Sequence, residues 1–416
     1  MKNKVYKNNW RKLDNTAKIF SLDDYRNTNI FRYSVLLKED IDVNILEKAL
    51  NISLIDCPSF KMKIGAGLFW NYLELNDKTP IIKEENEIPC EYINLKKNND
   101  YLFKITYYKN KINLDIFHVL TDGTGAIVLL KNLIYNYLNL KYNLKHNISI
   151  ENNPKNYQDQ YLKYYDANYK LNYNTKSSYQ LPGIANKKIN NTYHYIVSVK
   201  ELKKVCKKLD VTITEYLTAI YIYALYSSLY KKNSRKEIDV TIPINLRKFF
   251  NGETLANFFT YMNITSNVQG KKHVSFEEVL NYTKKEFKEK LTNDKIKEYL
   301  ARDVNLGMNL PIRLVPLIIK KLFIKFMGVL FTKSTTTTLS NVGIIEIEDN
   351  YKKYIDNILV LVRPGKTQKI KCTICSYEDK LNITINSNIN DKKFQKVFKE
   401  LLQDNLKKIK IESNKK

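Results

Sequence analysis

Segments patterned like strands and segments patterned like helices alternate along both halves of this chain. Ile30 to Leu37 have the pattern of a strand and Asn44 to Ser53 that of a helix. The second half restarts with a strand at Tyr193 to Val199, followed by helices from Lys200 and from about Thr212. This order predicts a layered α/β fold. With 416 residues, the chain is too long for one ordinary core, so we expect two domains.

A change in composition separates the two halves. Between about residues 142 and 191, Asn, Lys and Tyr dominate, and a Leu181-Pro182-Gly183 turn interrupts the segment. We therefore expect an N-terminal domain at residues 1–150, a crossover at 151–191 and a C-terminal domain at 192–416. The crossover is predicted to hold one helix, at about Gln158 to Tyr169.

A histidine ends the second strand of a predicted hairpin, which pairs Tyr101 to Tyr108 with Lys111 to Val119. Alternation along the second strand places His118 on one face with three apolar residues. The chain then turns at Asp122 and enters a helix predicted from Thr124 to Leu140. A histidine on an apolar face is more often a core residue. This strand–turn–helix setting instead favours a general base, whose ordinary pKa is close to neutral.

Asp122 has two compatible interpretations. It is placed to cap the following helix, and it could also be a buried carboxylate that holds the loop through an arginine. Gly123 and Gly125 would let the backbone turn sharply, because glycine has no Cβ.

Charge and cysteine usage narrow the functional classes. The formal net charge of +26 fits a partner rich in phosphate or carboxylate, but the lysines are spread along the whole chain, which favours a compositional bias. Cys372 and Cys375 fall in a strand pattern, where residues three apart point to opposite faces, so we expect ordinary packing rather than a metal site. The four histidines show no ligand spacing, and no glycine-rich phosphate loop is present, so no metal is predicted.

The N-terminal residues lack an apolar stretch, so we expect no signal peptide and a cytoplasmic location. The most apolar segment, Leu314 to Phe331, is interrupted by Lys320, Lys321 and Lys325. That pattern is poor for a membrane span and favours a packing helix, although it leaves peripheral membrane contact open.

The hexapeptide His118-Val119-Leu120-Thr121-Asp122-Gly123 resembles the HxxxDG signature of the CoA-dependent acyltransferase superfamily. This superfamily includes chloramphenicol acetyltransferase and the condensation domains of peptide synthetases. Residues 117–140 are most similar to its alcohol acetyltransferase-like branch. Other motifs follow in the family's order: Pro243-Ile244-Asn245-Leu246-Arg247 with Asn257-Phe258-Phe259, then Thr338-Leu339-Ser340-Asn341-Val342-Gly343, then Ser376-Tyr377-Glu378-Asp379-Lys380-Leu381. Many condensation domains have two adjacent histidines, of which the second is catalytic. Here Phe117 stands in place of the first, which makes membership of a peptide synthetase less expected.

The resemblance implies two chloramphenicol acetyltransferase-like domains, each a mixed β-sheet flanked by helices, that form a pseudo-dimer with the active site between them. His118 would deprotonate an alcohol or amine acceptor, which attacks an acyl thioester, and Ser340 or Thr338 would stabilise the oxyanion. Asp122 would pair with Arg247 to hold the histidine loop. Gly123, Asn257 and Asn341 would be structural at the site.

The expected donor is an acyl-CoA or an acyl carrier protein, used as a cosubstrate, with no bound cofactor. Two other classes remain open. One is a condensation-like protein that binds acyl-CoA or an acyl carrier without turnover, and the other is a basic nucleic-acid-binding protein. We expect a monomer. We expect no binding of nucleic acid, because no known binding module is present.

Overall fold

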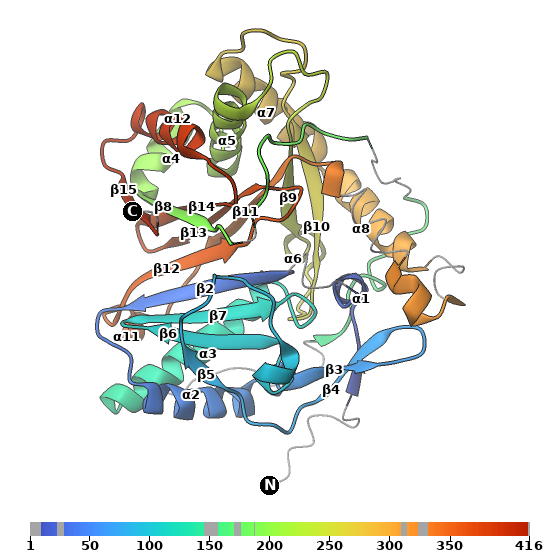
Figure 1. The fold of residues 1–416 in the computed structure, drawn as a ribbon, viewed down its shortest axis with the longest axis vertical. Coiled ribbons are helices and arrows are strands. Elements are labelled where there is room, and N and C mark those ends of the chain that lie inside the picture. Colours follow the sequence, from blue (N-terminus) through green and yellow to red (C-terminus); the bar gives the residue numbers. More distant parts are fainter. Residues whose placement is uncertain are drawn as a thin grey trace.

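Two β-sheets, each covered by helices, lie one above the other (Figure 1). The computed structural model describes residues 10–22, 29–144, 157–169, 176–186, 188–308, 314–322 and 332–414. This arrangement confirms the predicted α/β fold of two mixed sheets flanked by helices.

The lower sheet has five strands in the order β12-β2-β7-β6-β5, antiparallel except where β5 meets β6. Helices α2 and α3 pack together and supply much of the same hydrophobic core. The predicted hairpin is present as β6 and β7. The bounds are β2 Ile30–Leu37, β5 Ile82–Glu84, β6 Phe103–Tyr108, β7 Lys111–Phe117, β12 Ile355–Val362, α2 Val43–Asp56 and α3 Gly123–Tyr142.

The upper sheet has seven strands in the order β10-β9-β11-β13-β14-β8-β15. Its helices include α5, whose predicted capping box of Thr212 and Glu215 is present. The bounds are β8 Asn191–Ser198, β9 Asp239–Asn245, β10 Phe259–Thr265, β11 Thr337–Ile344, β13 Ile370–Tyr377, β14 Lys380–Ser387, β15 Lys410–Ser413, α4 Val199–Lys208, α5 Ile213–Leu229, α7 Phe276–Lys290, α8 Asn293–Met308 and α12 Lys392–Gln403.

Shorter elements fill the edges of the molecule. A three-stranded sheet of order β1-β4-β3 lies beside the five-stranded one, and α1 lies between this small sheet and α8. The bounds are β1 Trp10–Lys12, α1 Asn15–Phe20, η1 Pro58–Phe60, β3 Met62–Ala66, β4 Asn71–Leu75, η2 Leu95–Asn98, α6 Arg247–Phe250 and α11 Asp349–Lys352.

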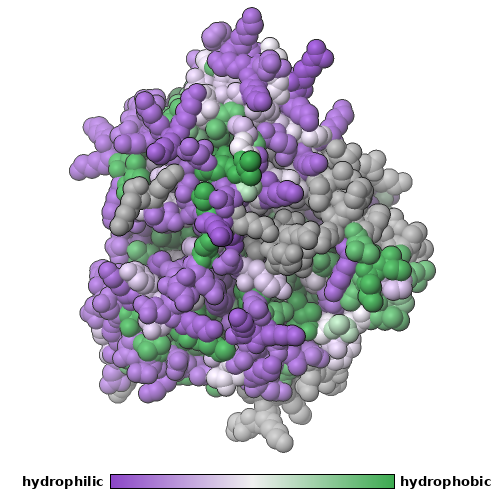
Figure 2. Space-filling view, in the orientation of Figure 1, coloured by the Kyte–Doolittle hydropathy of each residue, from purple (hydrophilic) through white to green (hydrophobic). Residues whose placement is uncertain are grey.

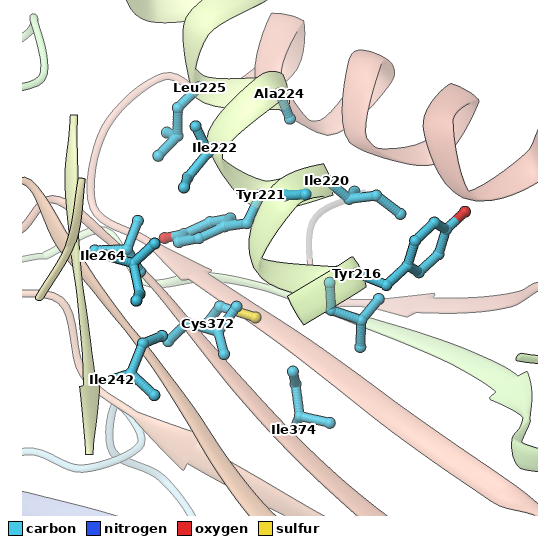
Figure 3. Close-up of a cluster of buried hydrophobic side chains, with 14 of the residues drawn as sticks. Tyr216, Ile220, Tyr221, Ile222, Ala224, Leu225, Ile242, Ile264, Cys372 and Ile374 are labelled. Carbon is cyan, nitrogen blue, oxygen red and sulfur yellow. The ribbon is translucent and has the colours of Figure 1, made fainter. Parts of the chain in front are cut away.

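The two faces of the seven-stranded sheet pack against different hydrophobic cores. On one face, Cys372 and Ile374 join the core under α5, where Tyr221 reaches across the strands toward Ile264 (Figure 3). On the other face, Cys375 belongs to the core of the five-stranded sheet. Both cysteines are buried, and the prediction that they point to opposite faces is confirmed.

Strand β12 connects the two sheets. It pairs with β2. Side chains of β13 and β14 also donate hydrogen bonds to backbone carbonyls of β12. Thr373 donates to the carbonyl of Val360 over 2.5 Å, and Asn386 donates to that of Val362 over 3.0 Å. A strand from the C-terminal half therefore completes the N-terminal sheet. The division at residues 150 and 191 stays a prediction, and β12 crosses it.

One expectation about local structure is wrong. Residues 158–169 form turns rather than the predicted helix. Tertiary contacts override the helical pattern there, because Tyr161 is fully buried and donates to the carbonyl of Phe259 over 2.6 Å, while Tyr164 packs on Phe258. Of the apolar segment 314–331, residues 323–331 lie outside the described residues, as does His146. Among the residues that the structure describes, no helix is long and apolar enough to cross a membrane.

An exposed apolar patch lies where residues 314–322 meet the β3–β4 hairpin (Figure 2). The two segments are joined by a hydrogen bond from the amide of Leu317 to the carbonyl of Leu68. Lys320 donates to the carbonyl of Phe69 over 2.8 Å and lies 3.6 Å from the ring centre of Trp70. The patch is defined by the exposed side chains of Leu68, Phe69, Leu314, Ile318, Ile319 and Leu322.

Candidate active site

His118 directly follows β7, where the chain leaves the five-stranded sheet. Its amide donates to the carbonyl of Asn29, which extends the pairing with β2 by one residue. The amide of Leu120 then donates to the carbonyl of Phe117, forming the turn that leads into α3. The strand, turn and helix predicted around the histidine are therefore all present.

Three phenylalanines surround the imidazole of His118. The ring centres of Phe31, Phe20 and Phe259 lie 4.4, 5.2 and 5.6 Å from that of the histidine. Burial among them lowers the pKa of His118 to about 4, while the Asp122 carboxylate opposes this shift. The side chain nevertheless keeps some solvent exposure. The imidazole is therefore largely desolvated, yet solvent still reaches part of it.

The amide of Asn257 determines which imidazole nitrogen is protonated. Its Nδ2 donates to Oδ2 of Asp14 over 2.9 Å and to the carbonyl of His118 over 2.8 Å. Its Oδ1 therefore faces Nδ1 of His118, at 3.3 Å. Because Oδ1 can only accept, Nδ1 carries the proton, and Nε2 keeps its lone pair.

Asp14 belongs to this site, and the sequence analysis missed it. It caps α1 by accepting from the amide of Ala17 over 2.7 Å, and its other oxygen accepts from both the amide and Nδ2 of Asn257. Burial raises the pKa of its carboxyl to about 7. An aspartate ahead of a helix start does predict a cap. Nothing in the spacing links it to a residue 243 positions away.

Asp122 and Arg247 form a buried ion pair. Nη1 of Arg247 lies 2.8 Å from Oδ2 of Asp122, and Nη2 lies 3.2 Å from Oδ1, so the contact is bidentate. The side chains are only 6% and 11% exposed. Asp122 also accepts from the amides of Thr124 and Gly125, so it caps α3 at the same time. Both interpretations of Asp122 therefore hold together.

The same ion pair ties the histidine loop to residues 254–258. Arg247 also donates to the carbonyls of Thr254 and Ala256, and Asp122 accepts from the amide of Phe258. Thr121 donates to the carbonyl of Leu255 over 2.5 Å. The contacts run in both directions between the two loops, so neither loop can shift without the other.

The glycines after Asp122 are required for close packing. A Cβ on Gly125 would lie 2.0 Å from Oγ1 of Thr121 and 2.3 Å from the carbonyl oxygen of Leu255, so no side chain fits. A Cβ on Gly123 would lie 3.0 Å from the hydroxyl of Tyr33. Both residues are helical rather than in a sharp turn, so the physical reason differs from the one expected.

The two hydroxyl candidates on β11 differ in their bonding. Thr338 donates to Oε1 of Gln368 over 3.0 Å. Ser340 is half-buried, and its hydroxyl makes no hydrogen bond to any part of the chain that the structure describes. Ser340 pairs with Thr373, whose side chain lies on the face toward β12. Ser340 is therefore the freer donor of the two.

Asn341 points the other way and takes no part in the site. Its Nδ2 donates to Oγ1 of Thr214 at the start of α5, and its Oδ1 accepts from the amide of Gly343. The structure thus brings together His118, Asp122, Gly123, Arg247 and Asn257 and places Asn341 on the opposite face. In the described ranges, no group of three His, Cys, Asp or Glu side chains could hold a metal.

Solved structures of acyltransferases share this fold. The chain is 13% identical to the trichothecene 15-O-acetyltransferase TRI3 from Fusarium sporotrichioides, with a TM-score of 0.62, covering 95% of this chain and 96% of that one. It is 12% identical to TRI101 from F. graminearum, solved in complex with coenzyme A and T-2 mycotoxin, with a TM-score of 0.63 and coverage of 97% and 99%. The epimerization domain of tyrocidine synthetase B is 10% identical, with a TM-score of 0.59 and 95% coverage of each chain. These identities establish the fold alone.

No curated protein sequence matches the chain. The model of the alcohol acetyltransferase family matches residues 155–406, more than half of the chain. That range holds Arg247, Asn257 and Ser340, whereas Asp14 and His118 precede it. The chain therefore belongs to the alcohol acetyltransferase family and is an acyltransferase.

Proposed function

We propose that this protein transfers an acyl group from an acyl-CoA to the hydroxyl of a small-molecule alcohol, with His118 as the general base. The hydrogen bond between Asn257 and Nδ1 carries the proposal, because it favours the tautomer in which Nε2 keeps its lone pair on a partly exposed ring. The similar structures support this choice, since TRI3 is an O-acetyltransferase and TRI101 was solved in complex with coenzyme A and T-2 mycotoxin. An amine acceptor or a carrier-protein thioester would use the same chemistry.

The reaction follows from these roles. Nε2 of His118 accepts the proton of the acceptor hydroxyl as its oxygen attacks the thioester carbonyl carbon. The carbonyl oxygen becomes an oxyanion, to which the Ser340 hydroxyl donates. Collapse of the tetrahedral intermediate breaks the carbon–sulfur bond. The thiolate leaves and takes the proton from the His118 imidazolium, giving an ester and free coenzyme A.

The other residues of the site act through the histidine. Asp122 and Arg247 hold its loop and touch no substrate in this scheme. Asn257 keeps the proton on Nδ1, and Asp14 keeps the Asn257 amide from flipping, because a flipped amide would face Oδ2 of Asp14 with another acceptor. Acyl-CoA serves as a cosubstrate, and no bound cofactor is needed. We also propose a cytoplasmic location and contact of the apolar patch with a membrane surface.

A thiol-release assay tests the proposal. We expect the purified protein to release free coenzyme A from acetyl-CoA or a longer acyl-CoA only when an alcohol is added, in amounts equal to the ester formed. A protein that binds acyl-CoA without turnover would show saturable binding and no thiol release. Salt-sensitive DNA binding without either would instead favour the nucleic-acid alternative.

The pH profile should report the buried histidine. Because burial lowers the pKa of His118 to about 4, the neutral base persists above that pH, and the acid limb of kcat/KM should lie near pH 4 rather than near 6.5. A lowered histidine pKa also means that the unfolded chain binds the proton more tightly. As the pH drops from about 6.5 to about 4, the melting temperature of the wild-type protein should therefore fall relative to that of His118→Ala.

Asp14→Asn is the matched control for this profile. It removes a carboxyl whose pKa is raised to about 7 and which reaches the imidazole only through Asn257. Any shallow limb near pH 7 should disappear in this variant while the limb near pH 4 stays. A main limb near pH 6.5 in the wild-type protein would contradict the buried, neutral base.

A further inference from the structure

Lys371 lies on the face of the seven-stranded sheet that is turned toward β12. Its neighbours in β13 alternate, so that Ile370 and Cys372 belong to the core under α5. Lys371 therefore shares the opposite face with Thr373, and the register places it beside Thr338 of β11. This is the face that carries Ser340 and meets the five-stranded sheet through β12.

Within the described ranges, the ammonium of Lys371 has no counter-ion. No acceptor or carboxylate lies within bonding distance of it among the described residues, although the side chain is half-buried. Other cations of the chain are paired, such as Arg247 with Asp122, Arg363 with Glu91 and Lys104 with Glu87. A partly desolvated charge without a partner is costly, so a protein rarely retains one without a use for it.

The charge is felt at the reacting centre. Lys371 pairs with Asn386 in the sheet, and the Asn386 side chain donates to the carbonyl of Val362 over 3.0 Å. Val362 pairs with Phe31, whose ring centre lies 4.4 Å from that of His118. This placement agrees with the contribution of Lys371 to the lowered pKa of His118. Burial lowers the pKa of Lys371 to about 8, and the group is still mainly charged at neutral pH. In coenzyme A, the uncharged pantetheine arm separates the thioester from the phosphates. A cation on this face, beside His118, would therefore contact the reacting groups rather than the phosphates.

The other polar groups on this face are engaged. Thr338 is bonded to Gln368, and Asn386 donates to the carbonyl of Val362 and accepts from Thr192. Among the side chains of β11 and β13 that the structure describes on this face, Lys371 and Ser340 thus have donors available for a ligand.

We propose that Lys371 binds a carboxylate on one of the two reacting molecules, either the acceptor alcohol or the acyl group of the donor. This inference rests on the proposed function. Such a carboxylate would give the ammonium the partner it lacks and would orient the reacting molecule beside Nε2 of His118. The enzyme would then select hydroxy acids over plain alcohols, or dicarboxylic acyl groups over acetyl.

Matched substrate pairs distinguish the two sources. One arm compares a hydroxy acid with its methyl ester as acceptor, using acetyl-CoA. The other compares malonyl-CoA with acetyl-CoA as donor, using a neutral alcohol. We expect kcat/KM for the carboxylate-bearing member of one arm to be about 10- to 100-fold higher, as a hydrogen bond to a charged group implies. Lys371→Met should abolish that ratio, and Lys371→Arg should retain part of it.

Lys369→Met is the matched control, because the Lys369 ammonium is already bonded to the carbonyls of Leu181 and Gly183. Its substrate ratio should equal that of the wild type. Lys371→Met should also melt higher than the wild-type protein without ligand, since it removes the unpaired charge. Equal ratios in wild type and Lys371→Met in both arms would overturn the proposal.

Failure of the proposed function would look different, because then no pair would release thiol. In that case, thermal-shift titrations of the same hydroxy acid and ester decide the matter without turnover. Stabilisation by the acid alone, lost in Lys371→Met, would support the carboxylate site. Equal shifts for acid and ester would overturn it.

Discussion

Replacing His118 by alanine is expected to lower kcat/KM for acyl transfer by about 100- to 10,000-fold, because a positioned general base typically contributes that much. The ring is held between Phe20, Phe31 and Phe259, with Nδ1 bonded to Asn257. Steady-state kinetics with acetyl-CoA and an alcohol, together with circular dichroism to establish folding, make the measurement.

His194→Ala is the matched control for this experiment. His194 is also desolvated, with its pKa lowered to about 4, but it lies in β8 of the seven-stranded sheet, where its Nδ1 is bonded to Thr384 of β14. If any loss of a buried histidine impaired the enzyme, the two variants would be alike. Near-normal turnover of a folded His118→Ala protein would refute the role of the histidine as base.

Replacing Asp122 by alanine should both destabilise the protein and remove activity. The change leaves the Arg247 guanidinium buried without its carboxylate, for which the expected cost is about 3–5 kcal/mol in the free energy of unfolding. It also removes the cap of α3, for which about 1 kcal/mol is typical. Denaturant unfolding and kinetics on the same preparation measure both effects.

The double variant Asp122→Ala with Arg247→Met sharpens this prediction. Because the two residues act as a pair, the double variant should lose clearly less stability than the sum of the single variants. Glu289→Ala, which breaks an exposed pair with Lys285 in α7, is the control and should melt like the wild type. An unchanged melting temperature in Asp122→Ala would reduce Asp122 to an exposed cap.

The parts of the fold that could be predicted were those encoded locally. The hairpin before His118 and helix α3 follow from short periodic patterns, and the capping box at Thr212 lies within four residues. The pair of Asp122 and Arg247 was accessible only through the family resemblance, because 125 residues separate them.

The parts that could not be predicted depend on contacts between distant segments. No local pattern joins Asp14 to Asn257 or β12 to β2. The orientation of Asn341 was within reach, since adjacent strand residues face opposite sides and Ser340 had been assigned to the site. The sequence does not distinguish Lys371 from the many other lysines of the chain. In the structure it differs because its ammonium has no partner among the described residues.

Strand β12, which comes from the C-terminal half but completes the N-terminal sheet, has a consequence for synthesis on the ribosome. When residues 1–150 have emerged, the N-terminal sheet has four of its five strands, and the edge of β2 that β12 will cover is bare. An unpaired edge of this kind invites pairing with other chains. The first half of the protein must therefore wait for residue 362, more than 200 positions later, before its sheet is closed. Translation speed through the second half, rather than the stability of the finished enzyme, then sets how long each nascent chain remains open to aggregation.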